Sequence, residues 1–181
     1  MNRRAFLLGC GFASAASAVE IDPSAKKLRA QILDAERAID RRFQTLTEET
    51  PPALLGATRG MYIADYGLVF SLQVNLVPVA GISPFRQAYS EEEKRQLNIR
   101  KRARLETLEI KSRQILVEET AKLTLLRSDD RAALAVTLFH FPWEDLTALP
   151  TQMVLSAPKA ALDRARAGDE AAARALKFRY F

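Results

Sequence analysis

Residues 60–78, GMYIADYGLVFSLQVNLVP, have the clearest residue pattern in the chain and decide the fold. Every even position of the second half is apolar, with polar residues among the positions between; the apolar set is Leu68, Phe70, Leu72, Val74 and Leu76. Alternation with a period of two predicts a half-buried strand. The apolar run 61–63 comes before it, and Asp65, Tyr66 and Gly67 supply turn residues between the two runs. We therefore predict a β-hairpin.

A helix is predicted before the hairpin, over residues 22–46. Asp22 followed by Pro23 supplies an N-cap and a first helical residue. Apolar residues then recur at intervals of three and four, the spacing of one helical face; they are Leu28, Ile32, Ala35, Ile39, Phe43 and Leu46. Charged residues of both signs occupy the other faces, as in a solvated helix.

A longer helix is predicted from Glu91 to about Leu126, a segment without Gly or Pro. Ser90 and Glu93 have the spacing of a capping box at its start. Its apolar stripe is formed by Leu105, Leu108, Ile115 or Leu116, Leu123 and Leu126. A run of six basic residues within 94–104 lies between glutamates, which indicates a solvated helix surface.

The rest of the chain alternates strands and helices. Residues 131–141 are rich in strand formers and residues 151–156 form a short apolar run, so two further strands are predicted. Pro158 fits the first turn of a helix that Gly168 ends. Residues 169–175 are predicted to be helical and 176–181 to form a terminal edge strand, with its inward side chains at Leu176, Phe178 and Tyr180.

The predicted order is helix, two strands, long helix, two strands, helix. It indicates an α/β (α+β) domain in which a mixed or antiparallel sheet of about four to five strands is covered by helices. The chain has 181 residues, so one domain over residues 19–181 is expected.

Residues 1–18, MNRRAFLLGCGFASAASA, read as an export signal with a basic start, an apolar middle and a small-residue end. Arg3 and Arg4 resemble the pair of a bacterial twin-arginine signal, which directs folded proteins across the inner membrane. Ala16 and Ala18 form an A-x-A cleavage site. The alternative is an ordinary secretory signal. Both predict a bacterial protein that is periplasmic or secreted.

The one cysteine, Cys10, lies inside this signal, where Leu7-Leu8-Gly9-Cys10 resembles a lipoprotein box. Use of this box would leave Cys10 as a lipid anchor. The apolar stretch before Cys10 is shorter than a usual signal core of ~7 residues, whereas reading through to Ala15 gives a normal length. Removal of residues 1–18 would leave no cysteine, and so no disulfide, cysteine nucleophile or thiolate metal site.

Charge and composition narrow the range of partners. The chain is 48% hydrophobic and 27% charged, which is ordinary for a globular protein. Loss of the signal removes two arginines and no acid, so the formal net charge falls from +5 to +3. This mild charge and the predicted export argue against nucleic acid as a partner. No apolar run approaches the ~18 residues that a transmembrane span needs.

Candidate catalytic residues are few. His140 is the only histidine and therefore the natural general base, and Glu144 and Asp145 follow it closely. The chain has no G-x-S-x-G nucleophile elbow and no glycine-rich phosphate loop. No cofactor and no metal site are predicted, because a lone histidine with scattered acids does not make a zinc site.

The sequence favours a non-catalytic domain that acts by binding another protein, or a second copy of itself as a homodimer. One alternative is an exported hydrolase that uses His140 with Glu144 or Asp145. Another is a binder of a small apolar ligand, which would need a lined cavity between sheet and helices.

Overall fold

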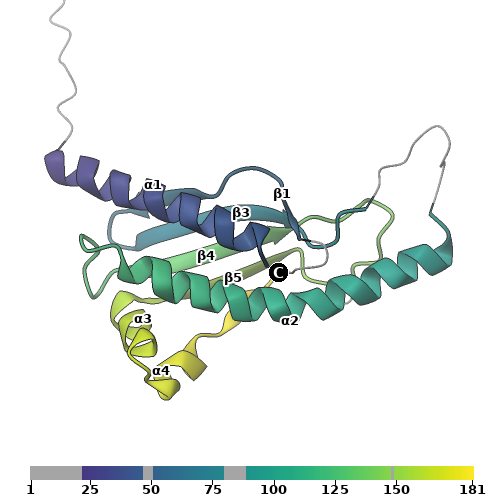
Figure 1. Ribbon diagram of the computed structural model, residues 1–181. Helices are drawn as coiled ribbons and strands as arrows, with labels where there is room; N and C mark the ends of the chain where they lie inside the picture. Colours follow the sequence, from purple (N-terminus) through teal and green to yellow (C-terminus); the bar gives the residue numbers. More distant parts are fainter. Residues whose placement is uncertain (1–21, 47–50, 80–88, 148) are drawn as a thin grey trace, which may run out of the picture.

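The computed structural model describes residues 22–46, 51–79, 89–147 and 149–181. Within these ranges the chain forms four helices and one six-stranded mixed sheet (Figure 1). The predicted α+β class is confirmed. The predicted export signal, with Arg3, Arg4, Cys10, Ala16 and Ala18, lies outside the described residues.

The sheet is built around β3 (Gly67–Asn75). Along one edge, β1 (Ala53–Leu54) and β2 (Arg59–Ile63) each pair with β3 in antiparallel orientation. On the other edge β3 pairs in parallel with β4 (Arg131–Leu138). Antiparallel pairing then adds β5 (Gln152–Pro158) and β6 (Phe178–Tyr180). The sheet has six strands, one more than the upper predicted number, because the two-residue β1 shares an edge with β2.

The predicted hairpin is confirmed in β2 and β3, with Ile63 opposite Gly67. Its turn contains Asp65 at φ 62°, and Gly67 follows at φ 119°, both in the left-handed region. A Cβ at Gly67 would overlap the carbonyl oxygen of Arg131, because β4 begins there against the turn. Glycine is therefore required at 67 by both conformation and space.

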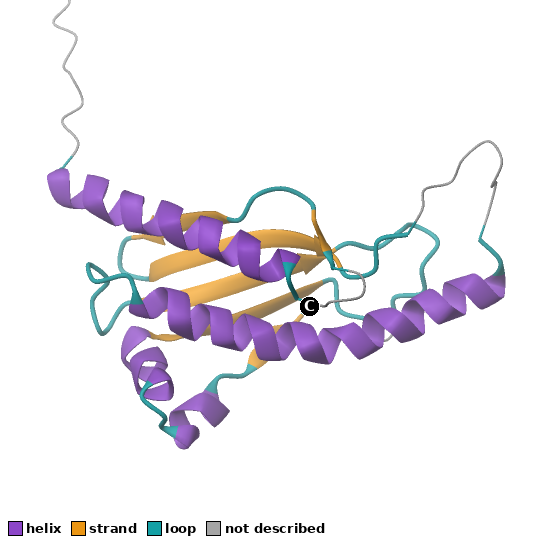
Figure 2. Ribbon diagram, viewed as in Figure 1, coloured by secondary structure: helices purple, strands orange, loops and turns teal. Residues whose placement is uncertain are grey.

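Two long helices, α1 (Pro23–Gln44) and α2 (Glu91–Ala121), lie side by side on one face of the sheet (Figures 1 and 2). Asp22 caps α1, and Ser90 with Glu93 forms the predicted capping box of α2. The predicted end of α2 near Leu126 is wrong, since the helix stops at Ala121. Turns carry the chain back towards β4, and they still bury the side chains of Leu123 and Leu126.

Two short helices, α3 (Lys159–Arg166) and α4 (Glu170–Ala175), follow β5: α3 packs against α2, and α4 packs against α3 (Figure 1). Gly168, at φ 94°, separates them, and Asp169 caps α4 by accepting from the Ala172 N–H. The predicted terminal edge strand is confirmed as β6. Of its predicted inward side chains, Leu176 before the strand is buried, Phe178 is half-buried and Tyr180 is exposed.

The core lies between the sheet and the two long helices. The even-numbered side chains of β3 face it, as predicted, together with Leu134, Val136, Met153 and Leu155 from the neighbouring strands. From above, α1 contributes Ile39 and Phe43, and α2 contributes Leu108 and Ile115. Close packing of this kind is what the apolar stripes of the helices provide.

Candidate functional site

The structure brings together two of the three predicted catalytic candidates. The predicted strand ends at Leu138 instead of residue 141, so His140 lies in the loop that follows β4. There the His140 Nδ1 lies 3.3 Å from the Glu144 Oε2. Asp145 is not part of this pair: its carboxylate accepts from the backbone N–H and hydroxyl of Thr147, which holds its pKa below the ordinary value. Asp145 shapes a turn.

A third residue, Lys101 of α2, completes the cluster. Its Nζ donates to both carboxylate oxygens of Glu144, at 2.6 and 2.7 Å, and to the carbonyl oxygen of Phe139 at 3.0 Å. The side chains of Lys101 and Glu144 are 1% and 0% exposed. Burial lowers the pKa of Lys101, and the contact with Glu144 opposes that shift.

Sequence reasoning missed Lys101 because it lies in a basic run that is typical of a solvated helix surface. One signal was available. Lys101 follows Leu97 by four residues and precedes Leu108 by seven, which places it on the buried stripe of α2. A basic residue on such a stripe needs a buried acid, and Glu144 is that acid.

The polar atoms of the cluster are occupied within the protein. Glu144 Oε1 also accepts from the Phe141 N–H at 2.8 Å. The His140 Nε2 lies 3.0 Å from the carbonyl oxygen of Pro150, which can only accept, so the hydrogen-bond network assigns a proton to Nε2. A general base needs a ring nitrogen that is free to take a proton from a substrate. The geometry instead suits a clamp that fastens the 139–150 loop to α2.

Aromatic rings surround the clamp. Phe141 stacks on Trp143 with 5.1 Å between ring centroids and 6° between planes, and Trp143 lies 4.9 Å from the ring of Tyr89. The Lys101 ammonium lies 6.0 Å from the centroid of Phe141. These rings keep the ion pair in a low-dielectric setting, where it is strong but costly to break.

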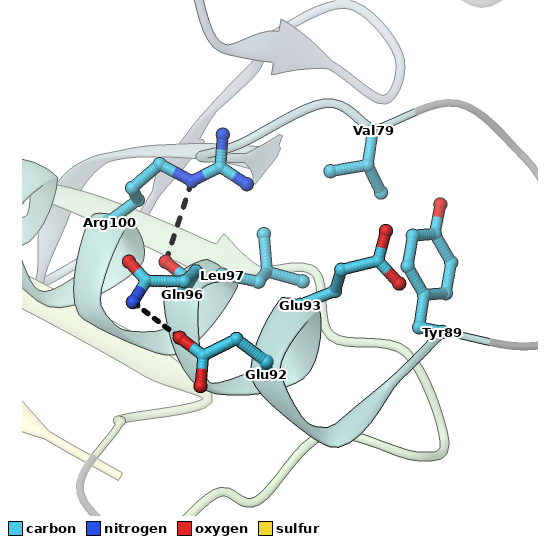
Figure 3. Close-up of a pocket in the computed structure, with 7 residues that line it drawn as sticks. All are labelled: Val79, Tyr89, Glu92, Glu93, Gln96, Leu97 and Arg100. Carbon is cyan, nitrogen blue, oxygen red and sulfur yellow. Dashed lines mark hydrogen bonds between the residues drawn. The ribbon is translucent and has the colours of Figure 1, made fainter.

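A hollow of about 340 Å³ lies next to the start of α2, with Leu97 in its wall (Figure 3). Two acids line it, and both are already bound. Glu92 accepts from Gln96 and pairs with Arg95, while Glu93 completes the capping box. The acids of this hollow therefore stabilise the first turns of the helix.

Residues 22–46, 51–79, 89–147 and 149–181 contain no group of three or more His, Cys, Asp or Glu side chains arranged to hold a metal ion. In the same part of the chain, no helix has the length and apolar character to cross a membrane.

The long helices α1 and α2 lie on one face of the sheet (Figure 2), and no described helix is seen to cover the opposite face. The odd-numbered side chains of β3 and β4 and the even-numbered ones of β5 point to it, because strand side chains alternate between faces. They form three neutral rows across the strands: Val69, Ala133 and Ser156; Ser71, Ala135 and Val154; and Gln73, Thr137 and Gln152. Ser71 and Gln73 are exposed, Ala133 is buried, and the other members of the rows on β4 and β5 are half-buried.

Arginines end the middle row on both sides. Arg59 of β2 pairs with Ser71, and Arg179 of β6 pairs with Val154. The middle row therefore crosses five strands and has an arginine at each end. Neither arginine has an ion-pair partner among the described residues. The strands put no Asp or Glu on this face. Arg131, the first residue of β4, lies on the same face, where its Nη2 donates to the hydroxyl oxygen of Ser156 at 2.8 Å. We call this surface, with its three rows of neutral side chains, the two arginines of the middle row and Arg131, the open face.

Exposed apolar side chains extend the open face over β2. Met61 pairs with Val69 and is 58% exposed, and Ile63, two residues further on, is 43% exposed. Methionine and arginine are both enriched in protein interfaces relative to the rest of the surface. The open face therefore combines a neutral centre, an apolar margin and arginines that form no ion pair with any described residue.

Comparison with protein-family models, with curated proteins and with solved structures finds no match to this chain.

Proposed function

We propose that this protein is an exported, non-catalytic interaction domain of a bacterium, and that its open face binds an acidic surface of a partner protein. The observation that carries the proposal is the row from Arg59 to Arg179, which offers two unpaired guanidiniums at the ends of a neutral line of side chains. A partner with carboxylates at matching positions would form charge-assisted hydrogen bonds with both ends.

The size of the open face suits this role. Strands ~4.8 Å apart and residues ~3.3 Å apart give the five-strand face a flat area of roughly 500 Å². A standard complex buries ~800 Å² on each partner, so the open face, which includes Met61 and Ile63 of β2, would supply the larger part of one side of such an interface.

A second copy of the chain fits the open face less well than an acidic partner. Two copies stacked face to face would bring arginines together without acids between them, and like charges across an interface cost affinity. The homodimer predicted as an alternative would need another surface.

The hydrolase alternative is less favoured by the geometry of the clamp. It requires His140 to accept a proton from a substrate, whereas its Nε2 faces Pro150 and its Nδ1 faces Glu144.

Export of the protein is proposed from residues 1–18 alone. Intact mass of the mature protein tests it: a start at Val19 supports cleavage after Ala18, and a lipid adduct on Cys10 supports the anchored alternative.

Site-specific photo-crosslinking in the producing bacterium tests the open face. A photo-reactive amino acid at Gln73, in the centre of the face, should give one discrete adduct with another protein. The same amino acid at Ala103, exposed on α2, is the matched control and should not give that adduct. An identical adduct from both positions, or none from Gln73, would contradict the proposal.

A further inference from the structure

A separate groove of about 400 Å³ lies between α2 and the α3 and α4 pair, away from the open face. Its walls are mainly apolar: Val117 from α2, Ala165 from α3, and Ala173 and Leu176 from α4 and its end. The volume falls in the range of ~300–1,000 Å³ that small-molecule sites occupy. The alanines leave the groove open where larger side chains would fill it.

An arginine is held in place at one side of the groove. The Nε of Arg113 donates to the carbonyl oxygen of Leu176 at 2.9 Å, and its guanidinium lies 5.2 Å from the ring centroid of Phe178. These two contacts fix the orientation of the side chain, and no other partner within the described residues takes its terminal nitrogens. The Arg113 fork is therefore pre-oriented, which lowers the entropy cost of binding an anion.

The charge of the groove is positive. Arg166 of α3 is the second cation, and no described acid forms an ion pair with it. Glu118 is the one acid in the lining, and its carboxylate lies 2.7 Å from the Arg42 guanidinium. The hydrogen bond from Arg42 holds the pKa of Glu118 below its ordinary value, so Arg42 balances its charge. Arg113 and Arg166 form no ion pair among the described residues, although the charge of Arg166 also helps to lower the pKa of Glu118.

We propose that this groove binds a small amphipathic carboxylate, with the carboxylate on the Arg113 fork and an apolar chain over Val117, Ala165 and Ala173. Planar bidentate recognition is what a guanidinium offers a carboxylate. The apolar walls favour a ligand whose main bulk is hydrocarbon over a free phosphate, which would leave those walls exposed to water. The proposal is independent of what the open face binds.

Calorimetric titration of the mature full-length protein with sodium dodecanoate, kept below its micelle concentration, tests this site. Saturable binding with one site per chain is expected, and dodecanol, which has the same chain without the charge, should bind at least tenfold more weakly. No binding of dodecanoate up to millimolar concentration, or equal binding of dodecanol, would overturn the proposal. Binding to anionic phosphatidylglycerol vesicles in place of free dodecanoate would also overturn it, since the occupant would then be a membrane surface.

Variants locate the site. Arg113→Gln should weaken dodecanoate binding at least tenfold, and Ala173→Trp, which fills the groove, should abolish it. Arg102→Gln on the same helix and Ala171→Trp on α4 are matched controls outside the lining, and they should bind within twofold of the parent. Unchanged thermal melting shows that each variant folds. A folded Ala173→Trp protein that still binds dodecanoate would contradict the assignment.

Discussion

The two faces of the sheet differ sharply although they share the same strands. Phe70, Leu134 and Leu155 point to the helix-covered face and are fully buried. Ser71, Ala135 and Val154 alternate with them and form the middle row of the open face. The helix-covered face therefore stabilises the fold, whereas the open face does not have to. Substitutions on the covered face should cost stability, whereas substitutions on the open face should change binding.

The largest contrast is expected between neighbours on β3. Phe70→Asp puts an unpaired charge in the core and should cost more than about 4 kcal/mol of the free energy of unfolding, enough to unfold a marginal domain. Ser71→Asp puts the same side chain on the open face and should cost within about 1 kcal/mol. Urea unfolding compares them. A folded, soluble Phe70→Asp protein would refute the assignment of the covered face.

The next largest loss of stability is expected at the buried cluster of Lys101, Glu144 and His140, on the side of the sheet that the helices cover. Lys101→Met leaves the Glu144 carboxylate buried without its cation and should cost about 3–5 kcal/mol. Adding Glu144→Gln removes the stranded charge, so the double variant should be more stable than Lys101→Met alone. Additive losses in the double-mutant cycle would mean that the two side chains do not act as a pair.

The next largest loss of stability is expected at the hairpin turn between β2 and β3. Gly67→Ala combines a left-handed φ with overlap of the Arg131 backbone and should cost about 2–4 kcal/mol. Gly56→Ala is the matched control, since Gly56 has φ 125° but nothing within 4 Å of a Cβ. It should lose only the conformational part, about 1–2 kcal/mol. Equal losses at the two positions would show that contact with β4 is unimportant.

The smallest effect concerns two neighbours on β6. Burial, with the hydrogen bond to Glu109, raises the pKa of Tyr180 from 10.0 to about 12. A raised folded pKa gives stability that is present below pH 10 and is lost as the pH rises towards 12. The free energy of unfolding should thus fall less steeply between pH 10 and 12 in Tyr180→Phe than in the parent. Arg179→Gln, on the open face, should keep the parent slope; equal slopes for all three proteins would contradict the contact with Glu109.

Local patterns explain what could be predicted from the sequence. The period-two run of β3, the capping box at Ser90 and the stop at Gly168 each depend on neighbours in the chain, and each is confirmed. Lys101 and Glu144 are 43 positions apart, so the sequence around Lys101 can show that it is buried but cannot show which acid it pairs with.

The open face could not be predicted from the sequence for the same reason. The row from Arg59 to Arg179 exists only once the register of five strands is known, and register across a parallel pair such as β3 and β4 is set by tertiary packing. The end of α2 was overestimated because buried Leu123 and Leu126 continue the apolar pattern through turns.

The most direct test of the open face is its double charge reversal, Arg59→Glu with Arg179→Glu, made in the protein that carries the photo-reactive amino acid at Gln73. We expect the free energy of unfolding in urea to stay within about 1 kcal/mol of the parent value, because both side chains are exposed, and the adduct from Gln73 to be lost. An undiminished adduct from a stably folded double variant would contradict the claim that the open face is the binding surface.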